Sequence, residues 1–264
     1  HFLPEPLAES LRTFGRPHRL TLNPLVQGAW ALLLSRYSGQ ADVVGGYTVS
    51  GRPPELPGVE EMVGLFINTL PARVAVDRDM PVVEWLRALQ DAQMTGRQFQ
   101  HIPLAKIRGW SEISSGQPLF ESILGFENYP LPEMGAAREA AADPGQADFR
   151  LYPLRSHSRT NFPLSLIVMP GSPIEIRLLY QGDRFGEAAI DRLAGHFRTL
   201  LENLCTSPAS LAIGKLSLLS SEERHQLVTV FAHGERRPPW DSPVYRRIED
   251  RSEERRVGKE WRSR

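Results

Sequence analysis

The sequence predicts an α/β fold, a two-layer sandwich in which a mixed β-sheet carries helices on one face. Two observations predict it. Segments with helical apolar spacing alternate along the chain with short runs rich in β-branched and aromatic residues. Turn signals between neighbouring strand-like runs also indicate hairpins. A sheet built from both kinds of connection buries one face under helices.

The first part of the chain predicts two helices, a strand and a loop. Residues 4–16 have helical spacing. A second helix is expected to begin at Asn23, a suitable N-cap followed by proline, and to end at Gly39. Residues 42–49 are rich in valine and predict a strand. Residues 50–58 hold three prolines and two glycines, which predicts an ordered loop without regular structure.

The middle of the chain predicts two strands separated by a helix. The first strand is expected over residues 70–76. Residues 79–99 then predict a helix that buries Trp85. Alternating apolar residues over 119–126 predict the second strand. Residues 130–148 are rich in alanine, glycine and proline, and predict a surface excursion.

The last part of the chain predicts a hairpin followed by two helices. Residues 164–169 and 174–180 predict strands joined by a Pro-Gly-Ser turn. Residues 185–205 carry a continuous apolar stripe and predict the clearest helix of the chain. A shorter amphipathic helix is expected over 220–231, with Ser221 as its cap.

Composition excludes several classes of protein. The 264 residues include 31 cationic and 31 acidic side chains, so there is no excess of positive charge for binding nucleic acid. The single cysteine, Cys205, excludes a disulfide framework and a cysteine-based metal site. No apolar run approaches the roughly 20 residues that span a bilayer, and no signal-peptide pattern opens the sequence. We therefore expect a cytoplasmic protein with no membrane partner.

No complete catalytic constellation is visible in the sequence. Phosphate-loop, nucleophile-elbow and zinc-helix motifs are absent. The seven histidines are scattered, and none is adjacent to another. His157 lies in a polar cluster before a strand and is either a general base or, as we favour, a loop histidine satisfied by its neighbours. His101 is expected near a helix end, Trp110 in the core, and Cys205 as an inert thiol.

Several stretches nevertheless occur in an order that resembles a known family. They are VGLFINTLPARV (63–74), RQFQHIPLAKI (97–107), GQPLFESILGFENYP (116–130) and RTNFPLSLIV (159–168). Together they resemble the C-terminal half of a condensation domain from a nonribosomal peptide synthetase. LSLLSSEERHQL (216–227) resembles the linker to an adenylation domain, and RPPWDSPVYRRIED (237–250) resembles the start of that domain.

The resemblance implies one subdomain of a V-shaped pair, each like chloramphenicol acetyltransferase. Residues 1–215 would form the C-terminal subdomain and 216–250 the linker and adenylation start. Residues 251–264 fit nothing in the family; we favour a non-native tail like a translated sequencing adapter over a natural, solvated charged tail. The family joins two carrier-bound thioesters in a peptide bond. Its catalytic motif, His-His-x-x-x-Asp-Gly, does not occur in this sequence, so the chain alone is expected to be inactive.

The same resemblance implies partners and a cofactor supply. The expected partners are the N-terminal condensation subdomain, peptidyl carrier proteins and the adjacent adenylation domain. No cofactor would bind directly, because phosphopantetheine arrives on the carrier proteins. Candidate residues of the substrate cleft or subdomain interface are, by resemblance, Ser50, Arg52, Asn68, Thr69, Arg73, Thr160 and Asn161.

Three of these candidates also have a structural interpretation. Asn68 and Thr69 are of types that readily satisfy the backbone at a strand start, and Arg73 is equally well interpreted as the partner of a surface carboxylate. Two other functions stay open: a non-catalytic module that docks a carrier protein or braces a neighbouring domain, and, less well supported, a freestanding acyltransferase that uses coenzyme A. A half-domain should also expose an apolar seam and self-associate.

Overall fold

A computed structural model describes residues 2–53, 55–114, 116–127, 160–232 and 246. The chain divides into two compact units, His1–Leu218 and Leu219–Arg264, which we describe separately. The predicted excursion over 130–148, His157 and the tail over 251–264 lie outside the described residues.

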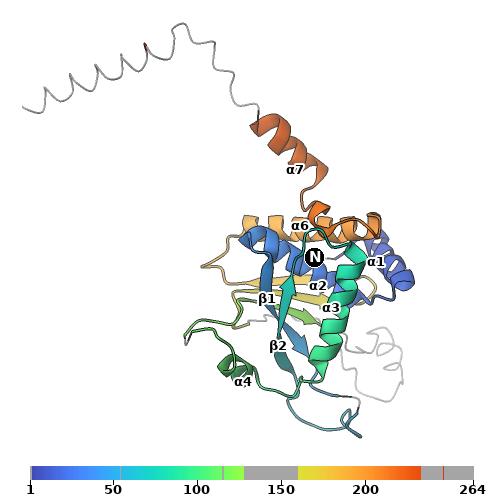
Figure 1. Cartoon of the computed structure of the whole chain (residues 1–264), viewed down its shortest axis with the longest axis vertical. Coiled ribbons are helices and arrows are strands. Elements are labelled where there is room, and N and C mark those ends of the chain that lie inside the picture. Colours follow the sequence, from blue (N-terminus) through green and yellow to red (C-terminus); the bar gives the residue numbers. More distant parts are fainter. Residues whose placement is uncertain (1, 54, 115, 128–159, 233–245, 247–264) are drawn as a thin grey trace, which may run out of the picture. The chain divides into compact units, whose positions relative to one another are not determined.

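The first unit is built on a mixed five-stranded sheet, as the sequence predicts (Figure 1). Its order is β2-β1-β3-β4-β5. The three central strands run parallel, and each edge strand pairs with its neighbour in the antiparallel sense. The strands are β1 (Asp42–Val49), β2 (Asn68–Ala75), β3 (Ser122–Phe126), β4 (Leu164–Met169) and β5 (Glu175–Tyr180).

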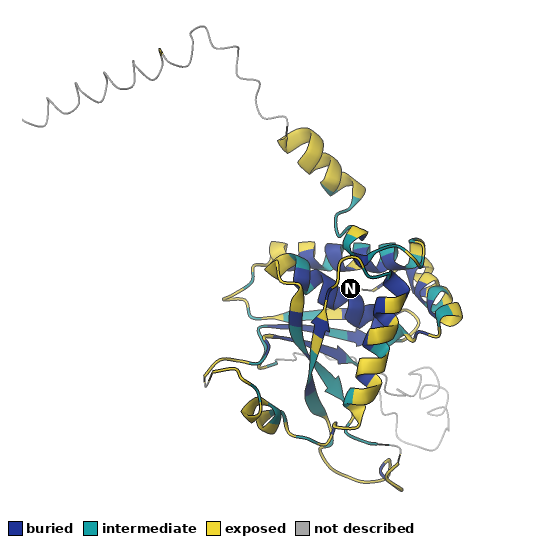
Figure 2. Cartoon of the chain, viewed as in Figure 1, coloured by how far each residue is buried: buried dark blue, intermediate teal, exposed yellow. Residues whose placement is uncertain are grey.

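Helices form the second layer. The central helix, α2, packs with α1 and α3 and most extensively with α6. Figure 2 shows their inward surfaces as buried and their outward surfaces as exposed. The helices of this unit are α1 (Glu5–His18), α2 (Leu22–Ser38), α3 (Val82–Arg97), α4 (Leu104–Gly109), α6 (Glu187–Thr206) and the short 3-10 helix η1 (Ile213–Lys215).

The core lies between the sheet and this helical layer. Alternate residues of β4, Leu164, Leu166 and Val168, belong to it, as expected for a strand with one face buried. Trp30 of α2 meets Phe197 of α6 edge-on at 5.9 Å between ring centroids. These contacts confirm the two-layer α/β sandwich.

The opposite face of the sheet is covered in part by aromatic side chains. Phe120 is buried and stacks on Phe162, with 5.4 Å between ring centroids. A Cβ at Gly46 would lie 2.3 Å from the Phe120 ring, so glycine is needed for this close approach. The sheet face opposite the helices is therefore partly apolar and partly covered by these two aromatic rings.

Several predicted boundaries are wrong for identifiable reasons. Helix α2 begins after Thr21, because the Asn23 side chain accepts a hydrogen bond from Gln93 instead of capping the helix. Helix α3 ends at Arg97, and Phe99 beyond it is exposed. Trp110 is 65% exposed, so its predicted place in the core is wrong.

The second unit contains α7 (Ser221–His225) and the π-helical turn η2 (Gln226–Phe231). The N-cap is Ser220 and not Ser221. Its hydroxyl accepts from the Glu223 amide at 3.1 Å, while the Glu223 carboxylate accepts from the Ser220 amide at 3.0 Å. This reciprocal capping box fixes where the helix begins.

Candidate functional site

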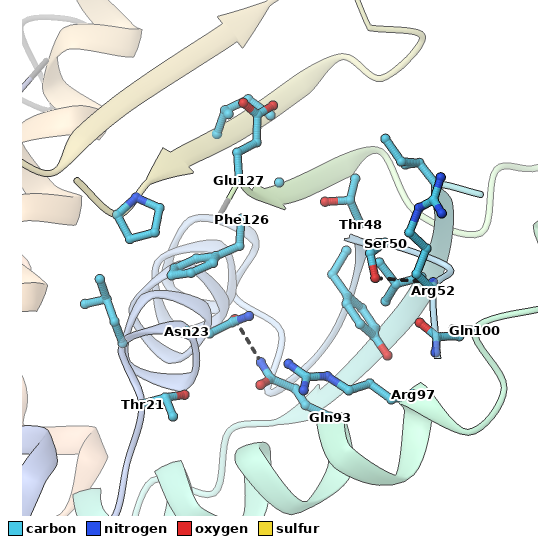
Figure 3. A pocket seen from close by; sticks show the side chains of 17 residues that line it. Thr21, Asn23, Thr48, Ser50, Arg52, Gln93, Arg97, Gln100, Phe126 and Glu127 are labelled. Carbon is cyan, nitrogen blue, oxygen red and sulfur yellow. Dashed lines mark hydrogen bonds between the residues drawn. The ribbon is translucent and has the colours of Figure 1, made fainter. Parts of the chain in front are cut away.

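A cavity of about 670 Å³ opens at the carboxyl ends of the parallel strands β1, β3 and β4 (Figure 3). Ligands of open α/β sheets commonly bind at this edge. The start of β2 reaches the same edge, because β2 is antiparallel to β1. The cavity is lined by Thr21, Leu22, Asn23, Tyr47, Thr48, Val49, Ser50, Arg52, Ile67, Gln93, Arg97, Gln100, Gly125, Phe126, Glu127, Ile167 and Pro170.

One wall comes from the helices α2 and α3, joined by buried amide side chains. The Gln93 amide nitrogen donates to Asn23 Oδ1 at 3.2 Å and also to Gln27 Oε1. Gln27 and Gln93 are both buried. Since a buried amide without a partner is costly, this network fixes the two helices relative to each other beside the cavity.

Tyr47 and the end of α3 form the adjoining wall. The Tyr47 hydroxyl lies against α3 at Gly96, where a Cβ would come within 2.5 Å of the hydroxyl oxygen. Burial raises the pKa of Tyr47, and the positive charge of Arg97 opposes part of that rise. The phenol therefore stays protonated near neutral pH and is able to donate a hydrogen bond into the cavity.

Arg52 lines the cavity but is bound to the loop that follows β1. Its guanidinium donates to the Val59 carbonyl and, at 2.8 Å, to the Met62 carbonyl. The guanidinium carbon lies 4.3 Å from the centroid of the Phe66 ring. Its neighbour Ser50 also lines the cavity, and the Ser50 hydroxyl accepts from the Arg52 amide at 3.4 Å.

The other candidates on β2 have local partners. The Asn68 side chain donates to the carbonyls of Gln100 and Ile102 at 2.9 and 2.7 Å, and accepts from the Thr69 amide at 2.8 Å. Asn68 thus joins the start of β2 to the segment between α3 and α4. These contacts correspond to the structural interpretation of Asn68 and Thr69.

Arg73 lies five residues further along the same strand, roughly 17 Å from Asn68 in an extended strand. Its guanidinium binds the Asp42 carboxylate at 2.6 and 2.9 Å. Hydrogen bonding from Arg73 lowers the pKa of Asp42. The structure therefore does not bring Arg73 to the cavity, and its contacts correspond to the surface ion pair.

Thr160 and Asn161 lie elsewhere, just before β4. The Thr160 hydroxyl is 2.7 Å from the Ser165 hydroxyl and donates to the Phe162 carbonyl at 3.2 Å. Thr160 lines a second cavity of about 530 Å³ beside β5, and Asn161 is exposed. Neither residue lines the first cavity.

Sequence reasoning missed much of the polar lining, above all Tyr47, Gln93, Arg97 and Gln100. Arg97 and Gln100 belong to the RQFQHIPLAKI stretch, so the motif itself was the available signal. Tyr47 lies in a segment that has the pattern of an ordinary strand.

Other chemistry is limited in the described residues. No group of three or more histidine, cysteine, aspartate or glutamate side chains there is placed to hold a metal ion. Burial raises the pKa of the Cys205 thiol to about 12, which accords with the predicted inert thiol. Within the same ranges, no helix has the length and apolar character needed to cross a bilayer.

Comparison with protein families gives a match over most of the chain. Residues 2–228 match the condensation-domain family. The chain is 46% identical over 224 residues to one of the linear gramicidin synthase proteins of Brevibacillus parabrevis, covering 85% of this chain and 4% of that protein. It is 37% identical over 224 residues to the chondramide synthase of Chondromyces crocatus, covering 85% and 6%.

Solved structures give the same fold. A four-domain nonribosomal peptide synthetase, solved with AMP and glycine bound, aligns over 85% of this chain and 18% of its own, with a TM-score of 0.70 and 18% identity. The first condensation domain of the calcium-dependent antibiotic synthetase aligns over 83% of this chain and 47% of its own, with a TM-score of 0.62 and 16% identity.

The fold and the family match together define the class of this protein. The chain belongs to the condensation-domain family. It spans a small fraction of the length of the synthases it matches, 4% and 6% for the two described above.

Proposed function

We propose that this chain is the C-terminal half of a condensation domain, which forms peptide bonds between aminoacyl or peptidyl groups held as thioesters on carrier proteins. The observation that carries the proposal is the share of each solved condensation domain that this chain covers. An alignment over 83% of the chain covers only 46 to 48% of condensation-domain structures. The chain also lacks the His-His-x-x-x-Asp-Gly sequence of the catalytic half.

In this proposal the cavity at the sheet edge is this chain's share of the substrate cleft. Its lining offers hydroxyl, amide and guanidinium groups on one side and apolar side chains such as Phe126 and Ile167 on another. Such a surface suits an acyl chain with amide and hydroxyl groups, like a phosphopantetheine arm with its substrate. Positioning of two thioesters would be the main contribution of a half without the catalytic histidine.

The exposed loop between β1 and β2 supports the proposal that another subdomain packs against this chain. Val63 and Leu65 are almost fully exposed, and Ile67 is half exposed at the cavity. We infer that the N-terminal condensation subdomain covers these side chains, since exposed apolar clusters mark interaction sites. Residues 216–250 would then lead to an adenylation domain; the boundary between the compact units, at Leu218, lies close to that start.

Reconstitution tests the proposal. The chain is mixed with a separately expressed N-terminal subdomain that carries His-His-x-x-x-Asp-Gly and with two loaded carrier proteins, and the carrier-bound product is measured by mass spectrometry. We expect no product from the chain alone and product from the full mixture. Turnover by the chain alone would overturn the half-domain proposal.

A second readout separates the alternative function. If the chain binds a carrier protein but forms no complex with any N-terminal subdomain, it acts as a docking module instead. The matched control replaces the histidine pair of the added subdomain by alanine, which should abolish product while leaving the complex intact.

A further inference from the structure

One end of the cavity presents polar groups that have no protein partner among the described residues. Gln100 is 8% exposed as a residue; its backbone is hydrogen-bonded, while its carboxamide has no hydrogen-bond partner among these residues and is reached by solvent from the cavity. The Tyr47 hydroxyl likewise has none. No fully buried side-chain nitrogen or oxygen of the described residues lacks a partner, so these two groups are open to solvent in the cavity and available to hydrogen-bond a ligand.

Arg97, an exposed side chain at the end of α3, supplies a positive charge beside them. It makes no ion pair with a described carboxylate, and its electrostatic effect is felt at Tyr47. Arg52, the other cation of the lining, is engaged with two carbonyls and a ring. Figure 3 shows Arg97 and Glu127 on opposite sides of the cavity, and the charge of Glu127 acts on Arg177. Among the described residues of the lining, Glu127 is the one carboxylate, and it does not neutralise Arg97.

The start of α2 adds to this positive field. Its N-cap, Thr21, makes no side-chain capping bond, and no acidic residue lies in the first turn. The N-terminus of a helix favours negative charge. Helix α3 ends at the same cavity with the opposite sign of dipole, and Arg97 in its last turn offsets that end.

We propose that Arg97, Tyr47 and Gln100 form a subsite for an oxyanion, a carboxylate or phosphate carried into the cavity by the incoming group. Arg97 supplies the charge, while the phenol and the carboxamide donate hydrogen bonds. The proposal deepens the proposed function, on which it rests for the source of the anion: a carboxylate comes from an acidic acyl group, and a phosphate from the carrier's arm.

Binding to the 264-residue chain tests the subsite without requiring turnover. The probes are glutaryl and pentanoyl thioesters of N-acetylcysteamine, which differ in one terminal carboxylate, and 4′-phosphopantetheine with pantetheine, which differ in one phosphate. Dissociation constants are measured by calorimetry. We expect one anionic probe of a pair to bind about tenfold or more tightly than its neutral counterpart, and the pair that discriminates identifies the source.

Two substitutions that each remove one positive charge distinguish the subsite from a general effect of charge. Arg97→Gln should remove the preference for the anionic probe, whereas Arg108→Gln, on the exposed α4 and outside the cavity, should keep it. Tyr47→Phe should weaken only the anionic probe, by a smaller factor. Thermal unfolding of each variant checks that the fold is kept.

The outcomes separate this proposal from the preceding one. Equal binding of anionic and neutral probes in both pairs, or equal effects of Arg97→Gln and Arg108→Gln, would overturn the subsite. Arg97-dependent binding together with failed reconstitution would leave the subsite standing and remove the half-domain function. Successful reconstitution with no anion preference would support the half-domain function and overturn the subsite.

Discussion

Arg52 acts at the scale of a single residue by holding a loop in one shape. Its guanidinium binds two carbonyls of the loop and covers the Phe66 ring. The loop also requires glycine at position 51, directly before Arg52. Gly51 has φ +67°, and a Cβ there would lie 1.7 Å from the Phe66 carbonyl oxygen. Arg52 therefore connects the cavity lining to the order of the loop that carries Val63 and Leu65.

Replacing Arg52 with methionine tests this connection. Methionine keeps an apolar stem and loses both hydrogen bonds and the charge. Because hydrogen bonds to charged groups contribute roughly 1.5–3 kcal/mol, we expect the loop amides of Leu56, Val59 and Glu61, which donate within the loop, to exchange at least about tenfold faster. Hydrogen exchange measured by NMR gives the result.

Arg73→Met is the matched control. It removes an equal charge and an ion pair with Asp42, but that pair is exposed, and exposed pairs contribute at most about 1 kcal/mol. Exchange in the loop should stay unchanged. If Arg73→Met releases the loop as much as Arg52→Met does, the role given to Arg52 is wrong.

At the scale of elements, local pattern predicted most strands and the end of α2 at Gly39, but not the start of α2 or the end of α3. Residues 42–49 and 164–169 were predicted with the observed bounds of β1 and β4, because valine-rich and alternating runs suit a half-buried strand. The start of α2 was missed because Asn23 is used in a tertiary contact with Gln93. Asn23 and Gln93 are 70 residues apart, so local sequence pattern does not predict their contact.

The candidate site was harder to predict for the same reason. Arg97 and Gln100 look like the polar face of an amphipathic helix and the turn after it, and only the tertiary arrangement brings them to β1. Conversely, Arg73 is polar and belongs to a motif, yet strand length carries it away from the cavity. Residue type and motif membership thus pointed to Ser50 and Arg52, which line the cavity, but not to the other polar side chains that face it.

A buried hydrogen bond between α2 and β3 gives a test at this scale. Trp30 Nε1 donates to the Ser122 hydroxyl at 3.0 Å, and both residues are buried. Ser122→Ala leaves the indole N–H without an acceptor, which should lower the free energy of unfolding by about 1–3 kcal/mol. Urea denaturation followed by tryptophan fluorescence measures the change.

Ser10→Ala provides the comparison for that measurement. Its hydroxyl donates to the Pro6 carbonyl on the exposed side of α1, where water can replace it, so we expect a change within about 0.5 kcal/mol. Equal effects of the two substitutions would mean that the Trp30–Ser122 bond does not link helix and sheet as described.

At the scale of the whole molecule, the mixed sheet places one loop in an unusual position. Because β2 returns antiparallel beside β1, their connection emerges at the edge where the parallel strands end and the cavity opens. Val63 and Leu65 are 102% and 93% exposed there. A compact unit with a well-packed core has no internal use for these two side chains, so an intermolecular surface is their expected environment.

The isolated chain should therefore associate with itself through this loop, and Val63→Ser with Leu65→Ser should reduce that association. Light scattering across a concentration series measures it, with Met94→Ser as control, since Met94 is an exposed apolar residue of α3. A monodisperse wild-type monomer would contradict the expectation.

Because the same surface is proposed to receive the N-terminal subdomain, adding that subdomain should suppress self-association of the wild-type chain. The double substitution should weaken the complex, while Met94→Ser should leave it intact.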